Sequence, residues 1–287
     1  MFGSLLRRLL KNAFTGRSVV LAQAGNGSKE LPQFGNLRLR RCLYGWMLFD
    51  GPFIGKCFEL YGEYSESEVS IFRRYLKPGD YAIDVGANIG DLTLPMAQIV
   101  GPEGRVFAIE SNPENFNVLC GNLALNQIRN VKTINRFIAD SSEVDTGSRV
   151  WGRYAYTGDV WAPEFMALDD LNLPRCEFIK VDVDGKELEV LRSAKRLIQA
   201  CQPVLYFEND EKARSAELLT FVLGLGYRIF AHFAPIFRED NFFGNPENAW
   251  SPGIIFSWMV LALPARVKEV PTDLPEISTS NFWWSEP

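Results

Sequence analysis

The chain has 287 residues, of which 47% are apolar, and it carries a formal net charge of −5. This size and composition predict one large α/β domain with extensions. The acidic balance argues against a general nucleic-acid-binding protein, which needs a basic face for phosphates. The five cysteines are scattered without a CxxC pair. They indicate neither a metal framework nor a disulfide scaffold and favour a reducing, cytoplasmic compartment.

The first 36 residues differ in pattern from the rest. Apolar residues recur at helical spacing over residues 1–14 with arginine and lysine between them, and a glycine-rich linker follows at residues 24–36. The basic residues interrupt any apolar core of a secretory signal. Three interpretations stay open for residues 1–14: an interfacial helix on anionic lipid, a helix packed on the domain or a partner, or a poorly ordered terminus. The longest apolar run of the chain, residues 253–264, is too short to span a membrane.

Residues 37–76 form a lead-in to the main domain. Short aromatic-rich strands or turns are predicted first, followed by a helix at residues 66–76 that stops at the turn 77–80. We expect this region to cover one end of a cofactor cleft. The main domain is predicted over residues 77–270, and residues 271–287 are predicted to be a tail.

Residues 81–99 predict a strand, a tight glycine turn and a helix, the first unit of a nucleotide-binding α/β sheet. Asp84 lies near the end of the strand, and Gly86 and Gly90 bracket the turn. A side chain at either glycine would keep the backbone away from a ligand or force a disfavoured φ. Asn88 replaces the middle glycine of the dinucleotide fingerprint, which weakens the case for a pyrophosphate. The alternative is a turn that only joins a strand to a helix.

The next strand, predicted at residues 105–109, ends at Glu110. Glu110 lies about 20 residues beyond Gly90, the spacing at which an acid accepts hydrogen bonds from ribose hydroxyls; a solvated carboxylate is the alternative. A helix begins after Ser111 and ends near residue 126. A third strand, predicted at residues 131–139, is followed by Asp140. This aspartate either meets an adenine edge or is an ordinary polar residue at a strand end.

Two later strands also end in acidic residues. The strand at residues 178–181 runs into the acidic turn 182–185, and a helix with inward-facing leucines follows over residues 188–197. The strand at residues 203–207 ends in the run 208–210. Because strand ends of an open parallel sheet meet at one edge, where ligands bind, we expect the strand-end acids to lie on one rim. These acids are Asp84, Glu110, Asp182, Asp184 and Glu208.

Acids gathered on one rim attract a cation, and two cations fit. One is the sulfonium of S-adenosylmethionine. The other is a hard metal ion such as Mg²⁺, held through oxygen by Asp182, Glu208 and Asn209. The alternative for each single acid is helix capping or solvation.

Four segments in register resemble the FkbM-type family of S-adenosylmethionine-dependent methyltransferases: DVGANIG, VFAIESNPENF, FIKVDVDGKELEVL and PVLYFEND, within residues 60–262. The chain departs from the family at Asp184, where many members have Glu, and at Lys186, where many have His. The resemblance implies a Rossmann-like, seven-stranded methyltransferase sheet, mostly parallel with a C-terminal antiparallel strand pair, and O-methylation of a hydroxylated acceptor. It also implies a cofactor pocket lined by Asp84, Gly86, Asn88, Gly90 and Glu110, to which the strand-end positions add Asp140 and Asp182.

The late part of the chain fits this expectation. A helix is predicted at residues 213–223, and strands at 227–233 and 254–263 would form the final antiparallel pair. The connection between residues 232 and 248 combines amide and aromatic side chains, which suit a hydroxylated ligand. It resembles a loop in one branch of the family, which implies a role in the acceptor site.

Methyl transfer to an alcohol requires alignment of the acceptor and is helped by a base. The candidates for the base are Asp184, Glu208 and His232, the only histidine of the chain. A structural role is the alternative for His232, and a metal at Asp182 and Asn209 is another way to polarise the hydroxyl.

We therefore predict an S-adenosylmethionine-dependent O-methyltransferase that acts on a sugar, a glycan or another small hydroxylated metabolite. No nucleic-acid partner is expected, and a peripheral membrane contact through residues 1–14 is an additional expectation. Two other classes of function stay open. A nicotinamide-dependent Rossmann oxidoreductase shares the glycine turn and Glu110 but does not need the terminal antiparallel pair. A non-catalytic assembly subunit would bind S-adenosylmethionine without transferring its methyl group.

Overall fold

The computed structural model describes residues 33–139, 164–250 and 256–284. The amphipathic segment 1–14 and Asp140, for which contacts were predicted, lie outside the described residues. None of the helices in the described ranges is both long enough and apolar enough to cross a membrane.

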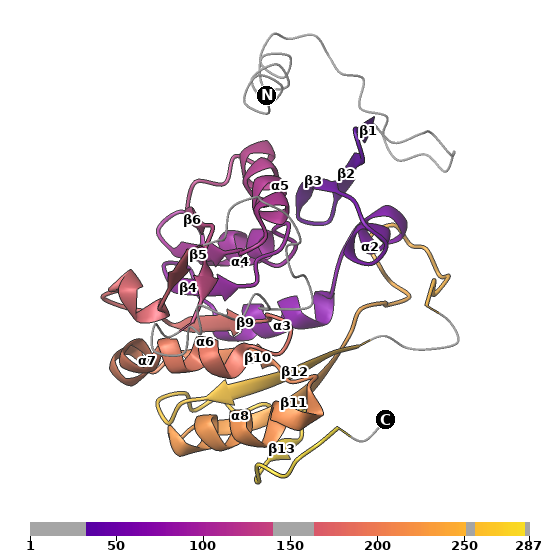
Figure 1. Ribbon diagram of the computed structural model, residues 1–287. Coiled ribbons are helices and arrows are strands. Elements are labelled where there is room, and N and C mark those ends of the chain that lie inside the picture. Colours follow the sequence, from indigo (N-terminus) through magenta and orange to yellow (C-terminus); the bar gives the residue numbers. More distant parts are fainter. Residues whose placement is uncertain (1–32, 140–163, 251–255, 285–287) are drawn as a thin grey trace.

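An eight-stranded sheet forms the centre of the protein (Figure 1). Its strands, in spatial order, are β13 (Glu276–Ile277), β11 (Arg228–Pro235), β12 (Phe256–Leu263), β10 (Val204–Glu208), β9 (Phe178–Val181), β4 (Tyr81–Val85), β5 (Arg105–Ile109) and β6 (Val131–Ile134). The five strands from β10 to β6 are parallel, and β12 is antiparallel to both β10 and β11. The predicted mostly parallel sheet with a C-terminal antiparallel pair is confirmed, and the short β13 adds an eighth strand at the edge.

Helices cover both faces of the sheet. The first face carries α3 (Glu66–Tyr75), α4 (Thr93–Val100) and α5 (Pro113–Leu125), and the second carries α6 (Glu187–Ser193), α7 (Lys195–Cys201) and α8 (Lys212–Gly224). Side chains of a strand alternate between the two faces. Thus Ile83 and Val85 of β4 lie in the core formed with α6 and α8, whereas Ala82 lies in the core formed with α3 and α4.

Two elements differ from their predicted extents. The strand predicted at residues 131–139 stops at Ile134 and resumes as β7 (Phe137–Ile138), which pairs with β8 (Phe165–Met166) in a separate two-stranded sheet. A 3₁₀ turn, η1 (Leu168–Leu171), follows β8. The helix predicted over residues 188–197 is divided at Ala194 into α6 and α7, because the backbone there leaves the helical conformation.

The lead-in region forms a small antiparallel sheet beside α5. It contains β1 (Gln33–Phe34), β2 (Leu37–Cys42) and β3 (Gly45–Phe49), and α2 (Ile54–Leu60) follows. Figure 1 shows β3 lying against α5, with α2 on the other side of the small sheet.

Asn122 of α5 and Asn126, the C-cap residue of the same helix, bond the edge of β3 in place of another strand. Asn122 accepts from the Leu48 N–H at 2.6 Å and donates to the Leu48 carbonyl at 3.0 Å; Asn126 does the same for Trp46 at 2.8 and 2.7 Å. We call these four residues the asparagine ladder. Gly45 permits this approach, because a Cβ there would collide with the Asn126 side chain. The ladder therefore pairs an edge strand that would otherwise expose its hydrogen-bonding groups.

Candidate active site

The carboxyl ends of the parallel strands bring the predicted acids to one edge of the sheet. Asp84 of β4 lies directly beside Lys180 of β9, and Lys180 lies beside Tyr206 of β10. All three side chains point to the face covered by α3, α4 and α5. Side chains two residues apart along a strand direction lie on the same face. Asp182 and Glu208 therefore follow Lys180 and Tyr206 on this face, and Glu110 follows Ala108, the neighbour of Asp84 on β5. The predicted rim is thus a single row of polar groups on one face.

The glycine turn and Glu110 are in contact. The Asn88 N–H donates to Glu110 Oε2 at 2.8 Å, and the Asn112 N–H donates to Oε1 at 2.7 Å. Burial raises the pKa of Glu110, and these two backbone hydrogen bonds oppose the rise. Asn88 adopts a φ of +47°, a conformation that asparagine tolerates better than most residues. The carboxylate retains further lone pairs for a ligand.

Gly86 holds the turn against the strand end of β9. It has a φ of +79°, and a Cβ at this position would collide with the Asp182 carbonyl oxygen. Any larger residue would push apart the glycine turn and the acidic turn that carries Asp182. The glycine is therefore required both for the backbone conformation and for the close approach of the two loops.

Lys180 is a site residue that the sequence reasoning missed, although a lysine inside the apolar strand FIKV was an available signal. Its side chain is 2% exposed, and Nζ lies 3.4 Å from Asp84 Oδ1 and 3.5 Å from Asp182 Oδ2. It also donates to the Gly86 carbonyl at 3.3 Å. Burial opposes its charge, but the surrounding carboxylates outweigh burial and raise its pKa above the ordinary value. Lys180 is therefore a buried cation that joins the glycine turn to Asp182.

Asp91, directly after the glycine turn, was also missed. Its side chain is buried, and Oδ1 has no hydrogen-bond partner. Burial raises its pKa to about 8. Asp84, by contrast, accepts from the Thr93 hydroxyl at 2.6 Å, while its other oxygen makes only the ion pair with Lys180. These carboxylates fit a ligand that brings a positive charge or hydrogen-bond donors, because buried carboxylate oxygens are otherwise costly.

Asp182 and Glu208 form a hydrogen-bonded carboxyl pair across the ends of β9 and β10. Burial and the charge of Asp182 raise the pKa of Glu208 strongly, so Glu208 is the member of the pair that holds a proton. Asn209, the third residue predicted to hold Mg²⁺, is buried with an unbonded amide nitrogen, which is not a metal-ligating atom. Among the described residues no group of three or more His, Cys, Asp or Glu could hold a metal ion. The structure therefore gives no support for the predicted metal.

The acids in and after the acidic turn, Asp182, Asp184 and Glu187, have different surroundings. Asp184 is exposed and adopts a φ of +51°. Glu187 is buried, and its Oε1 accepts from the Val183 and Gly185 N–H groups at 3.1 Å each. Glu187 thus holds the shape of the turn. Asp182, not Asp184, is the residue of this turn that the structure brings against Glu208.

His232 lies level with Glu208, two strands away on β11. Both ring nitrogens have protein partners: Nε2 lies 3.0 Å from the Ser67 hydroxyl and Nδ1 lies 2.8 Å from the Tyr206 hydroxyl. Burial lowers its pKa to about 4, so the imidazole is neutral near pH 7. With both nitrogens bonded within the protein, His232 has the geometry of a structural residue.

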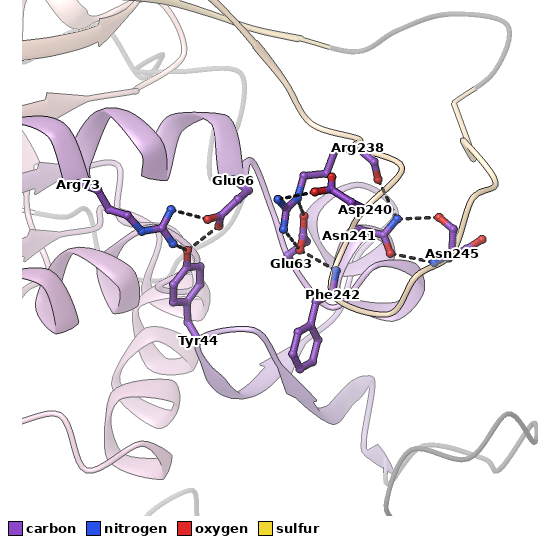
Figure 2. Close-up of polar contacts among 9 residues, drawn as sticks. All are labelled: Tyr44, Glu63, Glu66, Arg73, Arg238, Asp240, Asn241, Phe242 and Asn245. Atoms are coloured by element: carbon purple, nitrogen blue, oxygen red, sulfur yellow. Dashed lines mark hydrogen bonds and ion pairs between the residues drawn. The ribbon is translucent and has the colours of Figure 1, made fainter.

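The connection after β11 is fixed to the turn between α2 and α3. Glu63, in that turn, accepts from Arg238 Nε and Nη2 at 2.5 and 3.0 Å and from the Phe242 N–H at 2.8 Å (Figure 2). Asn241 closes the loop on itself through the carbonyls of Arg238 and Asn245. The polar and aromatic loop predicted to serve the acceptor is therefore held against the helix pair beside the rim.

The same helix pair is tied to the small N-terminal sheet. Glu66 of α3 accepts from the Tyr44 hydroxyl at 2.5 Å and from Arg73 at 2.6 Å (Figure 2). Glu66 and Glu63 lie on opposite sides of the start of α3, and both carboxylates have donors on each oxygen. The start of α3 is thus anchored from two directions.

Comparison with known proteins points to one family. The family described as "Methyltransferase FkbM domain" matches residues 84–229. The chain is 48% identical over 46 residues to a protein-L-isoaspartate O-methyltransferase of Triticum aestivum, a stretch that covers 16% of this chain and 20% of that one. The matched stretches span a fifth to a quarter of the curated relatives.

Two solved structures are similar to this one. The first is a precorrin-6y C5,15-methyltransferase of Geobacter metallireducens, with 15% identity, a TM-score of 0.46 and coverage of 69% of this chain and 88% of that chain. The second is a methyltransferase FkbM of Methylobacillus flagellatus, with 17% identity, a TM-score of 0.45 and coverage of 68% and 50%. The family match begins at Asp84, contains the glycine turn, Glu110 and the Asp182–Glu208 pair, and extends over just over half of the chain. The chain therefore belongs to the FkbM methyltransferase domain family.

Proposed function

We propose that this protein transfers the methyl group of S-adenosylmethionine to a hydroxyl oxygen of a sugar, a glycan or another small hydroxylated molecule. Family membership supports methyl transfer, and the glycine turn beside Glu110 supports a donor that contains a nucleoside. The observation that carries the choice of a hydroxyl acceptor is the carboxyl pair of Asp182 and Glu208. An alcohol must lose its proton when its oxygen is methylated, and this pair has one carboxylate ready to accept it.

The residues around the glycine turn fit the cofactor. Glu110 has lone pairs left for ribose hydroxyls, and the bare turn from Gly86 to Gly90 allows a close approach to the backbone. Asp84 supplies negative charge where a sulfonium needs it, and Asp91 adds a buried carboxyl oxygen without a hydrogen-bond partner. The bound cofactor supplies an activated methyl group on a positively charged sulfur. The protein's task is then to orient the acceptor and to remove its proton.

Asp182 is the proposed base. Its side chain is 34% exposed, whereas that of Asp84 is fully buried, so only Asp182 is open to a substrate. Lys180 stabilises its negative charge from 3.5 Å, and Glu208 donates a hydrogen bond to it. As the carbon–oxygen bond forms and the methyl–sulfur bond breaks, with its electron pair going to sulfur, the acceptor hydroxyl becomes acidic and its proton passes to the Asp182 carboxylate. Glu208 keeps its own proton throughout and orients Asp182.

The test uses the full chain with methyl-tritiated S-adenosylmethionine and the glycan and small-molecule fractions of a cell extract, followed by identification of the labelled product. We expect label on an oxygen atom. Asp182→Asn should lower the transfer rate by about 10²- to 10⁴-fold, the usual contribution of a general base, and should change the affinity for S-adenosylhomocysteine little. The control is Glu103→Gln, an exposed acid just before the amino end of β5, at the opposite edge of the sheet. It should behave as the wild type.

Three outcomes would contradict the proposal: label on nitrogen or carbon, full transfer by Asp182→Asn, or no labelled product at all. Isothermal titration separates the remaining classes. Binding of S-adenosylhomocysteine without binding of NAD is expected for a methyltransferase. The reverse pattern would indicate a nicotinamide-dependent oxidoreductase, which shares the glycine turn and the acid at the end of the next strand.

A further inference from the structure

The start of α3 carries a capping pattern that does not cap. Ser65-Glu66-Ser67-Glu68 has the S-x-x-E sequence of a capping box, in which each of the outer side chains bonds a backbone N–H. In the structure Ser65 adopts a φ of +44° and its side chain makes no cap hydrogen bond. Its hydroxyl donates instead to Glu68 Oε1 at 2.7 Å. A strained serine and an inward-turned glutamate require an explanation other than helix stability.

Glu68 is buried with half of its carboxyl group unsatisfied. Its side chain is 1% exposed, and Oε2 has no hydrogen-bond partner. Burial raises its pKa to about 7, and the charge of Lys180 and the nearby hydroxyl groups of Ser65 and Ser257 oppose that rise. Of the two hydroxyl groups, only that of Ser65 has hydrogen-bonding geometry to the carboxyl group, and it bonds Oε1. Buried polar atoms in folded proteins are almost always bonded, so a lone carboxyl oxygen in this position indicates a missing donor.

The charged groups around Glu68 place it beside the proposed base. It interacts electrostatically with Lys180 and with Asp182, the proposed base. Burial raises the pKa of Tyr64, in the turn before α3, and the charges of Glu68, Asp91 and Asp182 add to the rise. Glu68 therefore reaches the rim from α3, beside Lys180 and Asp182.

We propose that Glu68 binds the methyl acceptor, and that its Oε2 accepts a hydrogen bond from a second donor group of that molecule. This inference rests on the proposed function. A hydroxyl or amino group held at Glu68 would turn a neighbouring hydroxyl towards Asp182, which is an orientation effect. The acceptor class is therefore a polyol or an amino alcohol, and a simple alcohol with one hydroxyl is a poor acceptor.

Glu68→Gln is the informative variant because it keeps the size of the side chain and the acceptor for the Ser65 hydroxyl. We expect the KM for the purified labelled acceptor to rise at least tenfold, while the affinity for S-adenosylhomocysteine stays within twofold of the wild type. The melting temperature should not fall, because the variant removes a buried carboxylate. Glu66→Gln is the matched control: Glu66 lies in the same turn, but its carboxylate is bonded by Tyr44 and Arg73. It should lower the melting temperature and leave the KM unchanged.

A Glu68→Gln variant with the wild-type KM would overturn the inference, and so would a lower melting temperature with a weakened S-adenosylhomocysteine affinity, which would indicate a structural role. Failure of the proposed function looks different. The wild-type chain would then bind S-adenosylhomocysteine and label no acceptor, and the inference about Glu68 would fall with it.

Discussion

The asparagine ladder and the carboxyl edge of the sheet both contain buried and half-buried polar groups, but they differ in how well the atoms of these groups are bonded. In the ladder, the oxygen and the nitrogen of both carboxamides have backbone partners. At the edge, Glu68 and Asp91 each keep an oxygen without a hydrogen bond, and the acids outnumber the cation Lys180. The two regions thus differ in whether their polar groups find all their hydrogen-bond partners within the protein.

This difference separates stability from binding. A buried polar group with all its partners adds a little free energy and fixes one arrangement, whereas one without partners costs free energy until a ligand supplies them. The ladder therefore holds the small N-terminal sheet to α5, and the edge is held ready for donors and positive charge. Replacing an asparagine of the ladder should thus lower the free energy of unfolding, whereas neutralising an unbonded carboxyl group at the edge should raise it.

The largest effect is expected for Asn122→Ala. The change removes the bonds to Leu48 and the 2.8 Å bond to the Ile89 carbonyl in the glycine turn. Three backbone groups lose their partners, at about 1 to 3 kcal/mol for each that stays buried. The free energy of unfolding, measured with urea, should fall by about 3 to 5 kcal/mol. Asn117→Ala, at an exposed position of the same helix, should change it by less than about 0.5 kcal/mol.

Equal losses for Asn122→Ala and Asn117→Ala would show that the ladder adds nothing to stability. The affinity for S-adenosylhomocysteine sharpens this test, because Asn122 also bonds the glycine turn. We expect binding to weaken in Asn122→Ala and to stay unchanged in Asn117→Ala.

A smaller effect, of opposite sign, is expected for Asp91→Asn. The pKa of Asp91 is raised to about 8 in the folded protein, whereas the unfolded aspartate loses its proton near pH 4. Between these values the folded state binds the extra proton, so Asp91 stabilises the fold at low pH and this contribution disappears as the pH rises through 8. One such group changes the free energy of unfolding by at most about 1.4 kcal/mol per pH unit.

Urea unfolding from pH 6.5 to 8.5 measures this effect. The wild-type stability should fall with rising pH, and Asp91→Asn should fall less steeply and exceed the wild type at pH 8.5. Glu68 and Glu187, whose pKa values burial raises to about 7, add to the slope in both proteins and cancel in the comparison. Parallel curves for the two proteins would mean that Asp91 is not held protonated in the fold.

The edge could be predicted from the sequence, but the ladder could not. Apolar runs that end in acids, separated by helical segments, place Asp84, Glu110, Asp182 and Glu208 at one rim of a parallel sheet. That argument needs only the order of the elements. The ladder depends on which distant backbone an asparagine of α5 meets, and a helix pattern carries no signal for a partner 74 residues away.

Side-chain direction explains the other misses. Glu68 lies in an acidic first turn, the position of a helix-capping acid, and only its burial shows that it faces the rim. The break in the predicted helix at Ala194 and the end of β6 at Ile134 have no signal in the apolar pattern from which both elements were predicted. The predicted metal was inferred from a count of acids at the rim. Sequence position could not show that two of the three residues would bond each other.

The smallest effect is expected at His232, which lies near the edge but is bonded like the asparagines of the ladder. This histidine lies at the level of Glu208, yet it resembles the ladder because Ser67 and Tyr206 occupy both ring nitrogens. If the bonding of buried groups separates stability from binding, His232 stabilises the fold and does not act as a base. His232→Gln should then lower the free energy of unfolding by about 1 to 2 kcal/mol through the lost hydrogen bonds.

The pH profile of methyl transfer distinguishes the two roles of His232. Its pKa is lowered to about 4 by burial, so the ring stays neutral between pH 6 and 8 and its replacement should leave the shape of the profile unchanged. Tyr206→Phe, which removes only the hydroxyl bonded to Nδ1, is the matched variant and should cost less stability with the same profile. If His232→Gln abolished transfer while the fold kept its stability, the imidazole would be acting on the acceptor. Complete hydrogen bonding would then no longer mark a buried polar group of this protein as structural.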